Sequence, residues 1–473
     1  MSYTAIVLVT LVAYQALLLA IGWWAKSRNH DESDFFLGGR GLGPLVAAIS
    51  YSSSASSAWT LLGVSGIAYL LGISAVWIAA GSFSGMLVAW FWIAPRLRRH
   101  SRERQLITMT DVLVQGCQNT MRRAIVASAS VIIVFSFTFY VAAQFQAAGS
   151  TFATAFQLPM TDSILIGALI IMIYTMLGGF WAVSVTDTVQ GLLMALSAVL
   201  LPVAALIEVG GVGGFMEGLR AVSSPAQLHW TGANAGLVAL GFVLGSLGIG
   251  LGTYGQPHLL VRFMALRDDR ALRQARVITI SWYSLVFLAM LFVGLVGHVL
   301  YAQLDNPENI FFLLTDSLFP AFLSAVVLAA VLSAIMSTAD SQLLVAASAI
   351  SHDLGFGTRR PQRQLLISRL TIVVLVVLAV VVAVFLPERI FSRVLFAWSA
   401  LGAAFGPVVF FRLADVALRP GAVLAAILTG FGLSVLFYLL PATPGDVLER
   451  LAPFAMATLI LLAGRTPAHG AVR

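Results

Sequence analysis

The sequence predicts an all-α protein that crosses a lipid bilayer many times. Three observations lead to this fold class: an apolar composition, a series of apolar runs of spanning length, and an uneven distribution of arginine between the connecting segments. Of the 473 residues, 59% are hydrophobic and only 10% are charged, and the mean hydropathy is +0.95. A soluble domain could not cover its surface with so few charges, so lipid is the main solvent.

Thirteen apolar runs approach the ~20 residues of helix that cross the hydrocarbon core of a bilayer. They lie near residues 3–24, 42–70, 73–94, 124–150, 163–181, 188–209, 235–255, 277–302, 318–351, 366–386, 391–411, 422–440 and 448–462. The first run lacks a preceding basic segment and a small-residue cleavage site, which favours a membrane helix over a signal peptide. No polar stretch is long enough to fold alone, so we expect one membrane domain over residues 1–473.

Arginine is concentrated on one side of the predicted membrane. With an extracellular N-terminus, the cytoplasmic segments hold almost all of the 27 Lys and Arg residues, including Arg28, Arg262 and Arg359. The exceptions are Arg220, Arg389, Arg393 and Arg450. One missed or extra helix would scramble this asymmetry, so it supports the count and places the N-terminus outside and the C-terminus in the cytoplasm. Topology therefore explains the basic clusters without a nucleic-acid partner.

Two of the predicted helices contain sequences that form poor continuous helices. Hydroxyl residues fill the second run between Ile49 and Ala58, and glycines recur along the seventh run, which ends at Gln256-Pro257. Small residues also serve simply for close helix packing. However, irregular backbone at membrane depth is tolerated where it lines a cavity or is buried in protein. The two segments lie five runs apart and cross in opposite directions, which is typical of a binding site between inverted repeats.

Polar residues in the apolar middle of the ninth run suit a hard monovalent cation. Ser337 and Ser341 stand four residues apart on one helical face beside Thr338. An ionisable group inside a membrane span is costly, so Asp340 indicates a cavity or a charged partner at this depth. The alternative is a hydrogen bond to a neighbouring helix. Asp187, at the predicted cytoplasmic start of the sixth run, is by itself typical of an N-cap.

Other reactive constellations do not stand out. The single cysteine, Cys117, excludes a disulfide within the chain and a cysteine-rich metal site. His258 follows Gln256-Pro257 and is predicted to lie at the membrane interface. Nothing resembles a hydrolase triad or a nucleotide-binding loop, which disfavours an enzyme and an organic cofactor.

Several strings are shared with one transporter family. From the first helix to at least the twelfth, the chain resembles the sodium:solute symporter family, most closely its sodium/proline permease branch. The resemblance rests on Asp34–Arg40 (DFFLGGR), Tyr174–Phe180 (YTMLGGF), Ala182–Gln190 (AVSVTDTVQ), Tyr254–Met264 (YGQPHLLVRFM), Met336–Thr338, Gln342–Leu344 and Gly402–Val409 (GAAFGPVV).

This resemblance implies a LeuT-like core of five plus five inverted helices, with repeats over 42–209 and 235–411 and accessory helices over 3–24 and 422–462. It implies a Na⁺ site made of main-chain oxygens around Ser53 and Ser56, the carbonyl of Ala334 and the hydroxyls of Ser337 and Thr338. A second cation or a proton would lie near Asp187, Asp340 and Ser341. The substrate would be bordered by Ser57, Ala58, Tyr140, Ile249, Thr253 and Tyr254.

The chain departs from the proline permeases at positions that matter for binding. Those permeases carry an aspartate at the position of Ala55 and a methionine at Ser56, and two aromatic residues where this chain has Ile249 and Thr253. Smaller side chains predict a wider pocket with less stacking area. We hypothesise that Asp340 together with Asp187 supplies the negative charge that Ala55 lacks.

These observations predict a multi-pass protein of a bacterial inner membrane that couples inward Na⁺ movement to uptake of a small organic solute, most simply an amino acid such as proline. Two alternatives stay open. One is a proton-coupled symporter of another amino acid or a carboxylate. The other is a transporter-like sensor that binds a solute without moving it.

Overall fold

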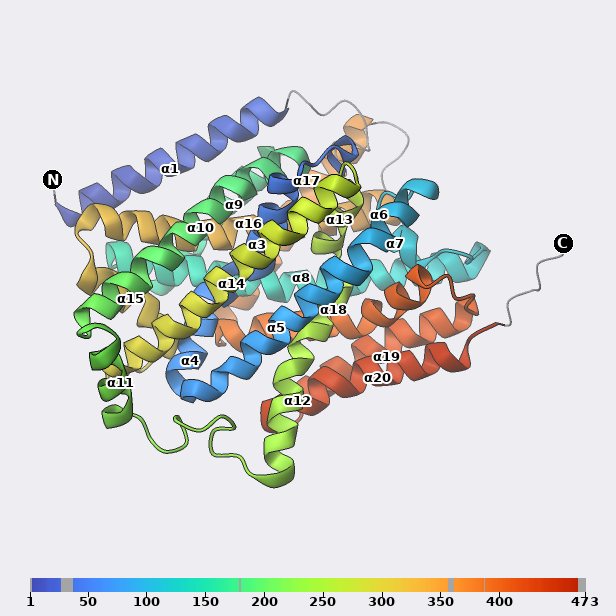
Figure 1. Ribbon diagram of the computed structural model, residues 1–473. Coiled ribbons are helices and arrows are strands. Elements are labelled where there is room, and N and C mark those ends of the chain that lie inside the picture. The colour runs from blue at the N-terminus through green and yellow to red at the C-terminus, as the bar shows by residue number, and fades with distance from the viewer. Residues whose placement is uncertain (1, 27–36, 178–179, 356–360, 387, 467–473) are drawn as a thin grey trace.

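The protein is a bundle of long helices that lie side by side (Figure 1). The computed structural model describes residues 2–26, 37–177, 180–355, 361–386 and 388–466, and this part of the chain contains no β-strand. Of the residues discussed above, Arg28, Asp34 and Arg359 and the glycines of the 174–180 motif lie outside the described residues.

The bundle contains long helices and broken helices of two or three pieces, joined by short elements. The long helices are α1 (Tyr3–Lys26), α8 (Asn119–Phe156), α9 (Met160–Leu177), α10 (Phe180–Glu208), α14 (Asp269–Leu300), α16 (Ala321–Ser348), α17 (Pro361–Phe385), α18 (Ile390–Leu413), α19 (Pro420–Leu439) and α20 (Val447–Ala463). The pieces of broken helices are α3 (Pro44–Ala58), η2 (Trp59–Val64) and α4 (Ser65–Leu71); α5 (Val76–Val88), η4 (Ala89–Ile93) and α6 (Ala94–Glu103); and α12 (Gly236–Gly252), η5 (Thr253–Gly255) and α13 (Pro257–Ala265). The remaining elements are η1 (Gly38–Arg40), η3 (Gly72–Ala75), α7 (Met109–Leu113), α11 (Gly211–Val222), η6 (Pro307–Asn309), α15 (Ile310–Leu318), η7 (Ala349–Asp353) and η8 (Pro444–Asp446).

The structure confirms the predicted set of membrane helices. Among the described residues, ten helices are long and apolar enough to span a bilayer by length and composition. One of them, over residues 44–103, reverses direction at Gly72, whose φ of 63° suits glycine, and so accounts for two predicted runs. The shorter apolar helix α9 corresponds to the fifth predicted run, and the 17-residue helix α20 covers the thirteenth. Helix α1 begins and α20 ends at opposite ends of the bundle (Figure 1).

Burial separates core helices from peripheral ones. In α18, 94% of the apolar 18-residue stretch is buried inside the protein. The corresponding share is 78% in α16 and 28% in each of α1 and α19. The predicted accessory helices therefore lie at the edge of the bundle, α1 on one side and α19 with α20 on another (Figure 1). At its centre α3 packs against α10, α14 and α16, and these four helices bring the site together.

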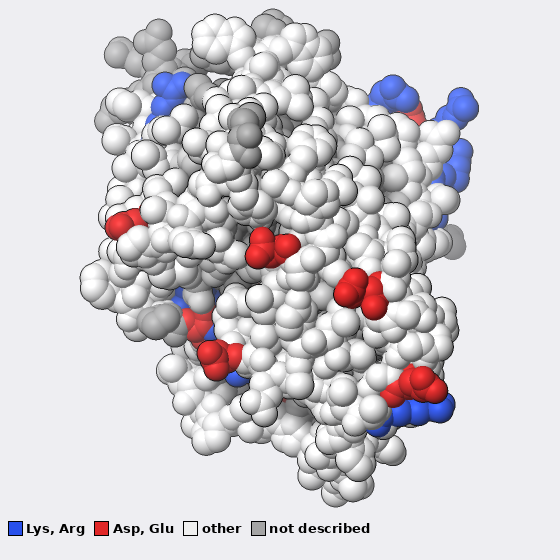
Figure 2. All heavy atoms as spheres, turned by 90° about the vertical axis from the view of Figure 1, so that its left-hand side faces the viewer, with Lys and Arg blue, Asp and Glu red and all other residues white. Residues whose placement is uncertain are grey.

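At the end of the bundle that carries α11 and α15, one buried carboxylate joins three segments. Glu308 in η6 accepts the backbone N–H groups of Ile390 (3.1 Å) and Phe391 (2.9 Å) at the start of α18. Its backbone also packs against Gly66 of α4, where an added Cβ would lie 3.0 Å from the Glu308 Cα atom. Burial raises the pKa of Glu308. Figure 2 views this end of the molecule, which is mostly uncharged and carries scattered acidic side chains.

Candidate functional site

The hydroxyl-rich second run is a broken helix, as predicted. Ser57 has φ 51° and ψ −173°, which interrupts α3 in the middle of the bundle. A non-glycine residue in this region is strained, and such strain persists only where the surrounding structure enforces it. Residues 47 to 58 of α3 are all buried. The break interrupts the regular helical hydrogen bonding of the last turn, where the carbonyls of Ser56 and Ser57 accept the Trp59 N–H.

The glycine-rich seventh run is broken as well. Helix α12 ends in the 3₁₀ turn η5, Gln256 is extended (φ −83°, ψ 101°), and Pro257 begins the separate helix α13. Proline is well suited to this first helical position because it needs no N–H partner there. The close approach of α12 to α18 requires glycine: a Cβ on Gly252 would lie 1.9 Å from the Trp398 ring, and one on Gly255 would lie 2.1 Å from the Leu401 carbonyl oxygen.

The oxygen ligands predicted for Na⁺ on α16 lie against the end of α3. The Thr338 hydroxyl donates to the carbonyl oxygens of Ser54 and Ala334, each at 3.1 Å. The Ser54 hydroxyl donates back to the Ser337 carbonyl at 2.7 Å, and the Ser337 hydroxyl lies 3.3 Å from the Ala334 carbonyl. All these residues are fully buried, as are Ser53 and Ser56 of the same proposed ligand set. The structure thus brings Ser337 and Thr338 of α16 against the turn of α3 that contains Ser54.

Beside Ser54 and Ser56, Ala55 borders a small central cavity. Its volume is about 10 Å³, and it is lined by Ala55, Trp59, Ser82, Tyr140, Ile249, Tyr283, Val394, Leu395 and Trp398. Two of the predicted substrate residues, Tyr140 and Ile249, are among them. The widening expected from the small Ile249 side chain is not seen, because aromatic rings from η2, α8, α14 and α18 fill the space. A cavity of this size holds no more than a water molecule.

The other predicted substrate residues do not line this cavity. The Tyr140 hydroxyl donates to the Ser57 hydroxyl at 3.5 Å, and the Ala58 N–H donates to Gln144 Oε1 at 3.2 Å. Thr253 is buried in η5. The Tyr254 ring instead packs edge-on against Phe410, with ring centroids 4.9 Å apart. The structure therefore groups Ser57, Ala58, Tyr140 and Ile249 and turns Tyr254 toward α18.

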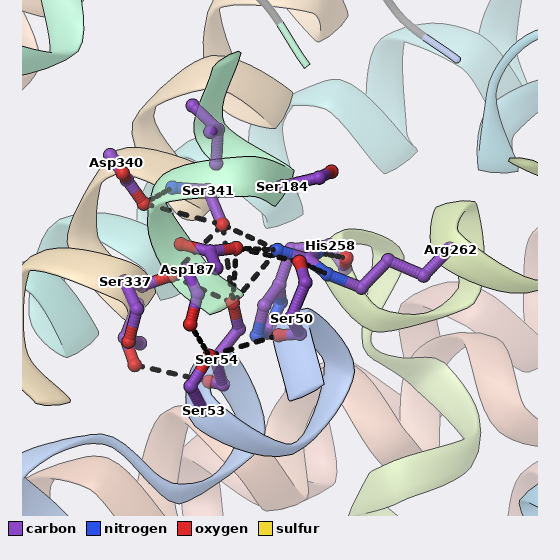
Figure 3. Close-up of polar contacts among 12 residues, drawn as sticks. Ser50, Ser53, Ser54, Ser184, Asp187, His258, Arg262, Ser337, Asp340 and Ser341 are labelled. Atoms are coloured by element: carbon purple, nitrogen blue, oxygen red, sulfur yellow. Dashed lines mark hydrogen bonds and ion pairs between the residues drawn. The ribbon is translucent and has the colours of Figure 1, made fainter. Parts of the chain in front are cut away.

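A buried ion pair lies next to the Na⁺ ligand set. Asp187 Oδ2 accepts from Arg262 Nη2 at 2.8 Å, and the two side chains are 0% and 1% exposed. The Ser50 hydroxyl also donates to Asp187 Oδ2, at 2.7 Å. The guanidinium further donates to the hydroxyls of Ser50, Ser54 and Ser341, each at 2.8 Å. These side chains converge from α3, α10, α13 and α16 (Figure 3).

Asp340 lies at the edge of this cluster. Its Oδ1 accepts the backbone N–H of Ser341 at 2.5 Å and the Ser341 hydroxyl at 3.3 Å. The Ser341 hydroxyl also accepts a hydrogen bond from the Arg262 guanidinium, which in turn donates to Asp187. Ser341 and Arg262 therefore connect the two aspartates (Figure 3). Among the described residues, Asp187 Oδ1 and Asp340 Oδ2 are buried without a hydrogen-bond partner. The structure therefore brings together the predicted Asp187, Asp340 and Ser341.

One local prediction is wrong here. Helix α10 begins at Phe180, so Asp187 lies inside the helix and is not its N-cap. Arg262, predicted to lie in a connecting segment, is buried in the short helix α13 and bonded to Asp187. His258 is 0% exposed, and its ring packs against Phe137 with centroids 5.3 Å apart. Arg262 could have been found from its apolar neighbours, since an arginine within such a stretch needs a buried partner.

Comparison with known proteins decides the assignment. The model of the sodium:solute symporter family matches residues 35–430. The chain belongs to this family. Membership makes it a membrane transporter and not an enzyme.

Relatives of this symporter match over most of their length. The chain is 35% identical to the osmoregulated proline transporter OpuE of Bacillus subtilis, over 90% of this chain and 87% of the relative. It is also 35% identical to the sodium/proline symporter of Escherichia coli, over 91% and 87%. The sodium/proline symporter 2 of Staphylococcus saprophyticus is 34% identical, over 89% and 84%.

Solved structures show the same fold. The symporter matches a substrate-bound, outward-open Na⁺-coupled sialic acid symporter with a TM-score of 0.79 and 16% identity, over 98% of this chain and 99% of the other. It matches MhsT, solved in complex with L-phenylalanine, with a TM-score of 0.55 and 14% identity, over 89% and 97%. The predicted LeuT-like fold is confirmed by these matches.

Proposed function

We propose that this symporter couples inward movement of Na⁺ to the uptake of a small zwitterionic amino acid, with proline as the first candidate. Relatives named as sodium/proline symporters and as a proline transporter support this choice of ion and solute. The symporter would lie in a bacterial cell membrane with its N-terminus outside. The observation that carries the proposal is the meeting of Thr338 on α16 with the broken end of α3.

The chemistry of this meeting point suits Na⁺. A hard monovalent cation prefers hydroxyl and carbonyl oxygens, and the set of Ala334, Ser337 and Thr338 supplies both kinds. In the structure the Thr338 hydroxyl donates to a carbonyl oxygen of α3 and to one of α16. A cation placed among these oxygens would satisfy the carbonyls of α3 and α16 together and would hold the two helices in register. Main-chain oxygens around Ser53 and Ser56 complete the proposed ligand set.

The lining of the central cavity sets the class of solute. Asp, Glu, Lys, Arg and His are absent from its lining residues. A cationic solute would lose its hydration without gaining a partner, so a neutral or zwitterionic solute is favoured over a cation. Ala55 lies between Ser54 and Ser56, and a cation bound there would face the solute's carboxylate. The rings of Trp59, Tyr140, Tyr283 and Trp398 would pack on the apolar part of an amino acid such as proline.

Transport requires this cavity to open. At about 10 Å³ it admits no amino acid, so the lining side chains have to separate before a solute can bind. We propose that helices from both repeats, over residues 42–209 and 235–411, shift relative to one another to open the cavity, while α3 and α16 stay together at the ligand set. The solute would then displace rings of α14 and α18 when the cavity faces one side of the membrane.

The test is uptake of radiolabelled proline into proteoliposomes under a Na⁺ gradient. We expect accumulation that depends on Na⁺ in the wild type and is lost in Thr338→Ala. Thr371→Ala is the matched control, because the Thr371 hydroxyl donates only to its own helix, at the Ile367 carbonyl (2.9 Å). Accumulation that ignores Na⁺ but follows a pH gradient would replace Na⁺ by H⁺ as the coupling ion. Proline binding without flux would identify a sensor.

A further inference from the structure

The guanidinium of Arg262 occupies a cage of oxygen atoms. Four hydrogen bonds of 2.8 Å join it to the hydroxyls of Ser50, Ser54 and Ser341 and to the carboxylate of Asp187. A fifth, from Nη1, reaches the carbonyl of His258 one turn earlier in α13. The Phe180 ring faces the guanidinium, 5.8 Å from its central carbon. Figure 3 shows the side chains pointing inward at Arg262 from α3, α10 and α16.

Without the arginine, this cage would be a cation site. Its oxygens are three hydroxyls and a carboxylate, and a second carboxylate, Asp340, lies beside it. All are buried, so they cannot exchange protein partners for bulk water. The cage shares Ser54 with the proposed Na⁺ ligand set, and Ser54 donates to the Ser337 carbonyl of that set. Two adjacent oxygen-rich sites therefore exist, and a side chain fills one of them.

We infer that the Arg262 guanidinium is the resident cation of this second site, so that the symporter binds Na⁺ only at the set around Ala334, Ser337 and Thr338. The single-ion count rests on the proposed Na⁺ coupling; the exclusion of an ion by Arg262 does not. A Na⁺ ion bound next to Asp187 would lie against the fixed positive charge of Arg262. It would also have to compete with the guanidinium for oxygens that already accept hydrogen bonds from that group.

The surroundings hold Arg262 in place. The side chain is 1% exposed and belongs to the short helix α13, of which every residue is buried. The adjoining cavity, which continues past Ser341 to Thr108 and Asp353, has a volume of about 30 Å³. That volume accommodates one or two water molecules beside the side chain. The guanidinium thus acts as a tethered ion that neither arrives nor leaves with the solute.

The consequence is a fixed ratio of one Na⁺ per solute. Within the cluster, the guanidinium neutralises one of the two carboxylates. Removal of the guanidinium leaves Asp187 Oδ1 and Asp340 Oδ2, which have no hydrogen-bond partner among the described residues, together with the emptied hydroxyl cage. This set has enough oxygen ligands for one additional Na⁺ ion. Arg262 would therefore determine ion stoichiometry without touching the solute.

The test is equilibrium binding of ²²Na⁺ to purified protein in lipid nanodiscs, which counts ions independently of transport. We expect one ion per wild-type chain, two in Arg262→Ala, and one in Arg262→Ala/Thr338→Ala, because each change affects a different site. Thr338→Ala alone should bind none. Arg276→Ala is the matched control, since this arginine contacts the Phe91 ring and the Trp90 carbonyl away from the cage, and its count should equal the wild type.

The outcomes separate this inference from the proposed function. A wild type that binds no Na⁺ while Arg262→Ala binds one would reject Na⁺ coupling and support the role of Arg262. Two ions in the wild type, or an unchanged count in folded Arg262→Ala, would overturn the inference. If Arg262→Ala does not fold, the neutral double variant Asp187→Asn/Arg262→Met decides the matter: an unchanged count supports the inference, and the loss of an ion shows that Asp187 binds Na⁺ in the wild type.

Discussion

Substitution of Gly252 by alanine tests whether the close contact between α12 and α18 determines the shape of the solute cavity. A Cβ at this position would lie 1.9 Å from Cδ1 of Trp398 and 2.3 Å from its Nε1, whereas ordinary contact begins at 3.4 Å. The indole ring therefore has to move by roughly 1.5 Å, or the helices have to separate. The indole N–H donates to the Ile249 carbonyl at 3.0 Å, so either movement breaks a buried hydrogen bond and shifts a wall of the cavity.

Two magnitudes follow for Gly252→Ala. Overpacking of this kind costs about 1–3 kcal/mol of stability. Loss of a well-placed aromatic ring from a binding site costs about 0.5–1.5 kcal/mol, so the solute concentration for half-maximal uptake should rise roughly two- to tenfold. The measurements are thermal unfolding in nanodiscs and proline uptake into proteoliposomes at saturating Na⁺.

Gly432→Ala is the matched control, because nothing lies within 4 Å of a Cβ added at Gly432 in α19. This variant should unfold at or slightly above the wild-type temperature, since alanine favours a helix over glycine by about 1 kcal/mol, and its uptake should be unchanged. The packing argument would be refuted by a Gly252→Ala protein with wild-type melting temperature and wild-type half-saturation.

Three further substitutions probe other parts of the chain. Asp187→Asn leaves Arg262 buried without its counter-ion and should cost about 3–5 kcal/mol, whereas Asp187→Asn/Arg262→Met should recover most of that loss in SDS-titrated unfolding. Burial raises the pKa of Glu308, so its protonated form favours the folded state; stability should fall as pH rises from the ordinary glutamate pKa to the raised value, and Glu308→Gln should lessen that fall in melting temperature. Burial also raises the pKa of Cys117, so maleimide should label the native protein much more slowly than the SDS-unfolded protein at neutral pH.

Each of these expectations has a contrary result. If the double variant is no more stable than Asp187→Asn, the cost does not come from an uncompensated charge on Arg262. Parallel pH profiles for the wild type and Glu308→Gln would show that this carboxyl does not contribute to the pH dependence. Equal labelling of native and unfolded protein would show that Cys117 is accessible in the folded state.

The fold could be predicted because a bilayer imposes simple rules on the chain. Each span needs an apolar run and an internally hydrogen-bonded backbone, and connecting arginines stay on one side. Both broken helices were also predictable, since serines around Ser57 and glycines before Gln256 are poor formers of a continuous membrane helix. Local composition carries this information, so no tertiary contact has to be known.

The ion pair could not be predicted in the same way. Arg262 follows Pro257, and the apolar run stops at that proline, so a rule based on continuous runs places the arginine in a loop. Its partner Asp187 lies 75 residues earlier, and a rule for helix starts explains this aspartate without any partner. Only the packing of α13 against α3 and α10 makes the two charges neighbours.

Cavity size depends on residues that are equally far apart. The small Ile249 side chain predicts a wider pocket, but the volume is set by what packs opposite it. Tyr283 of α14 and Trp398 of α18 fill that space, and nothing in the sequence near Ile249 indicates them. The sequence shows the chemical type of each lining residue, whereas the packing between their side chains depends on the folded bundle.

The capping of α18 by Glu308 implies an order of assembly. The N–H group of Ile390 is satisfied by a carboxylate that lies 82 residues earlier in the chain. Once η6 has docked against α4, this carboxylate is in place to accept the N–H donors at the start of α18. Residues of η6 are synthesised well before α18, so the Glu308 carboxylate is already present when α18 inserts. A chain with Glu308→Ala should therefore insert all its helices yet mature slowly, with α18 accessible to protease near its first turn.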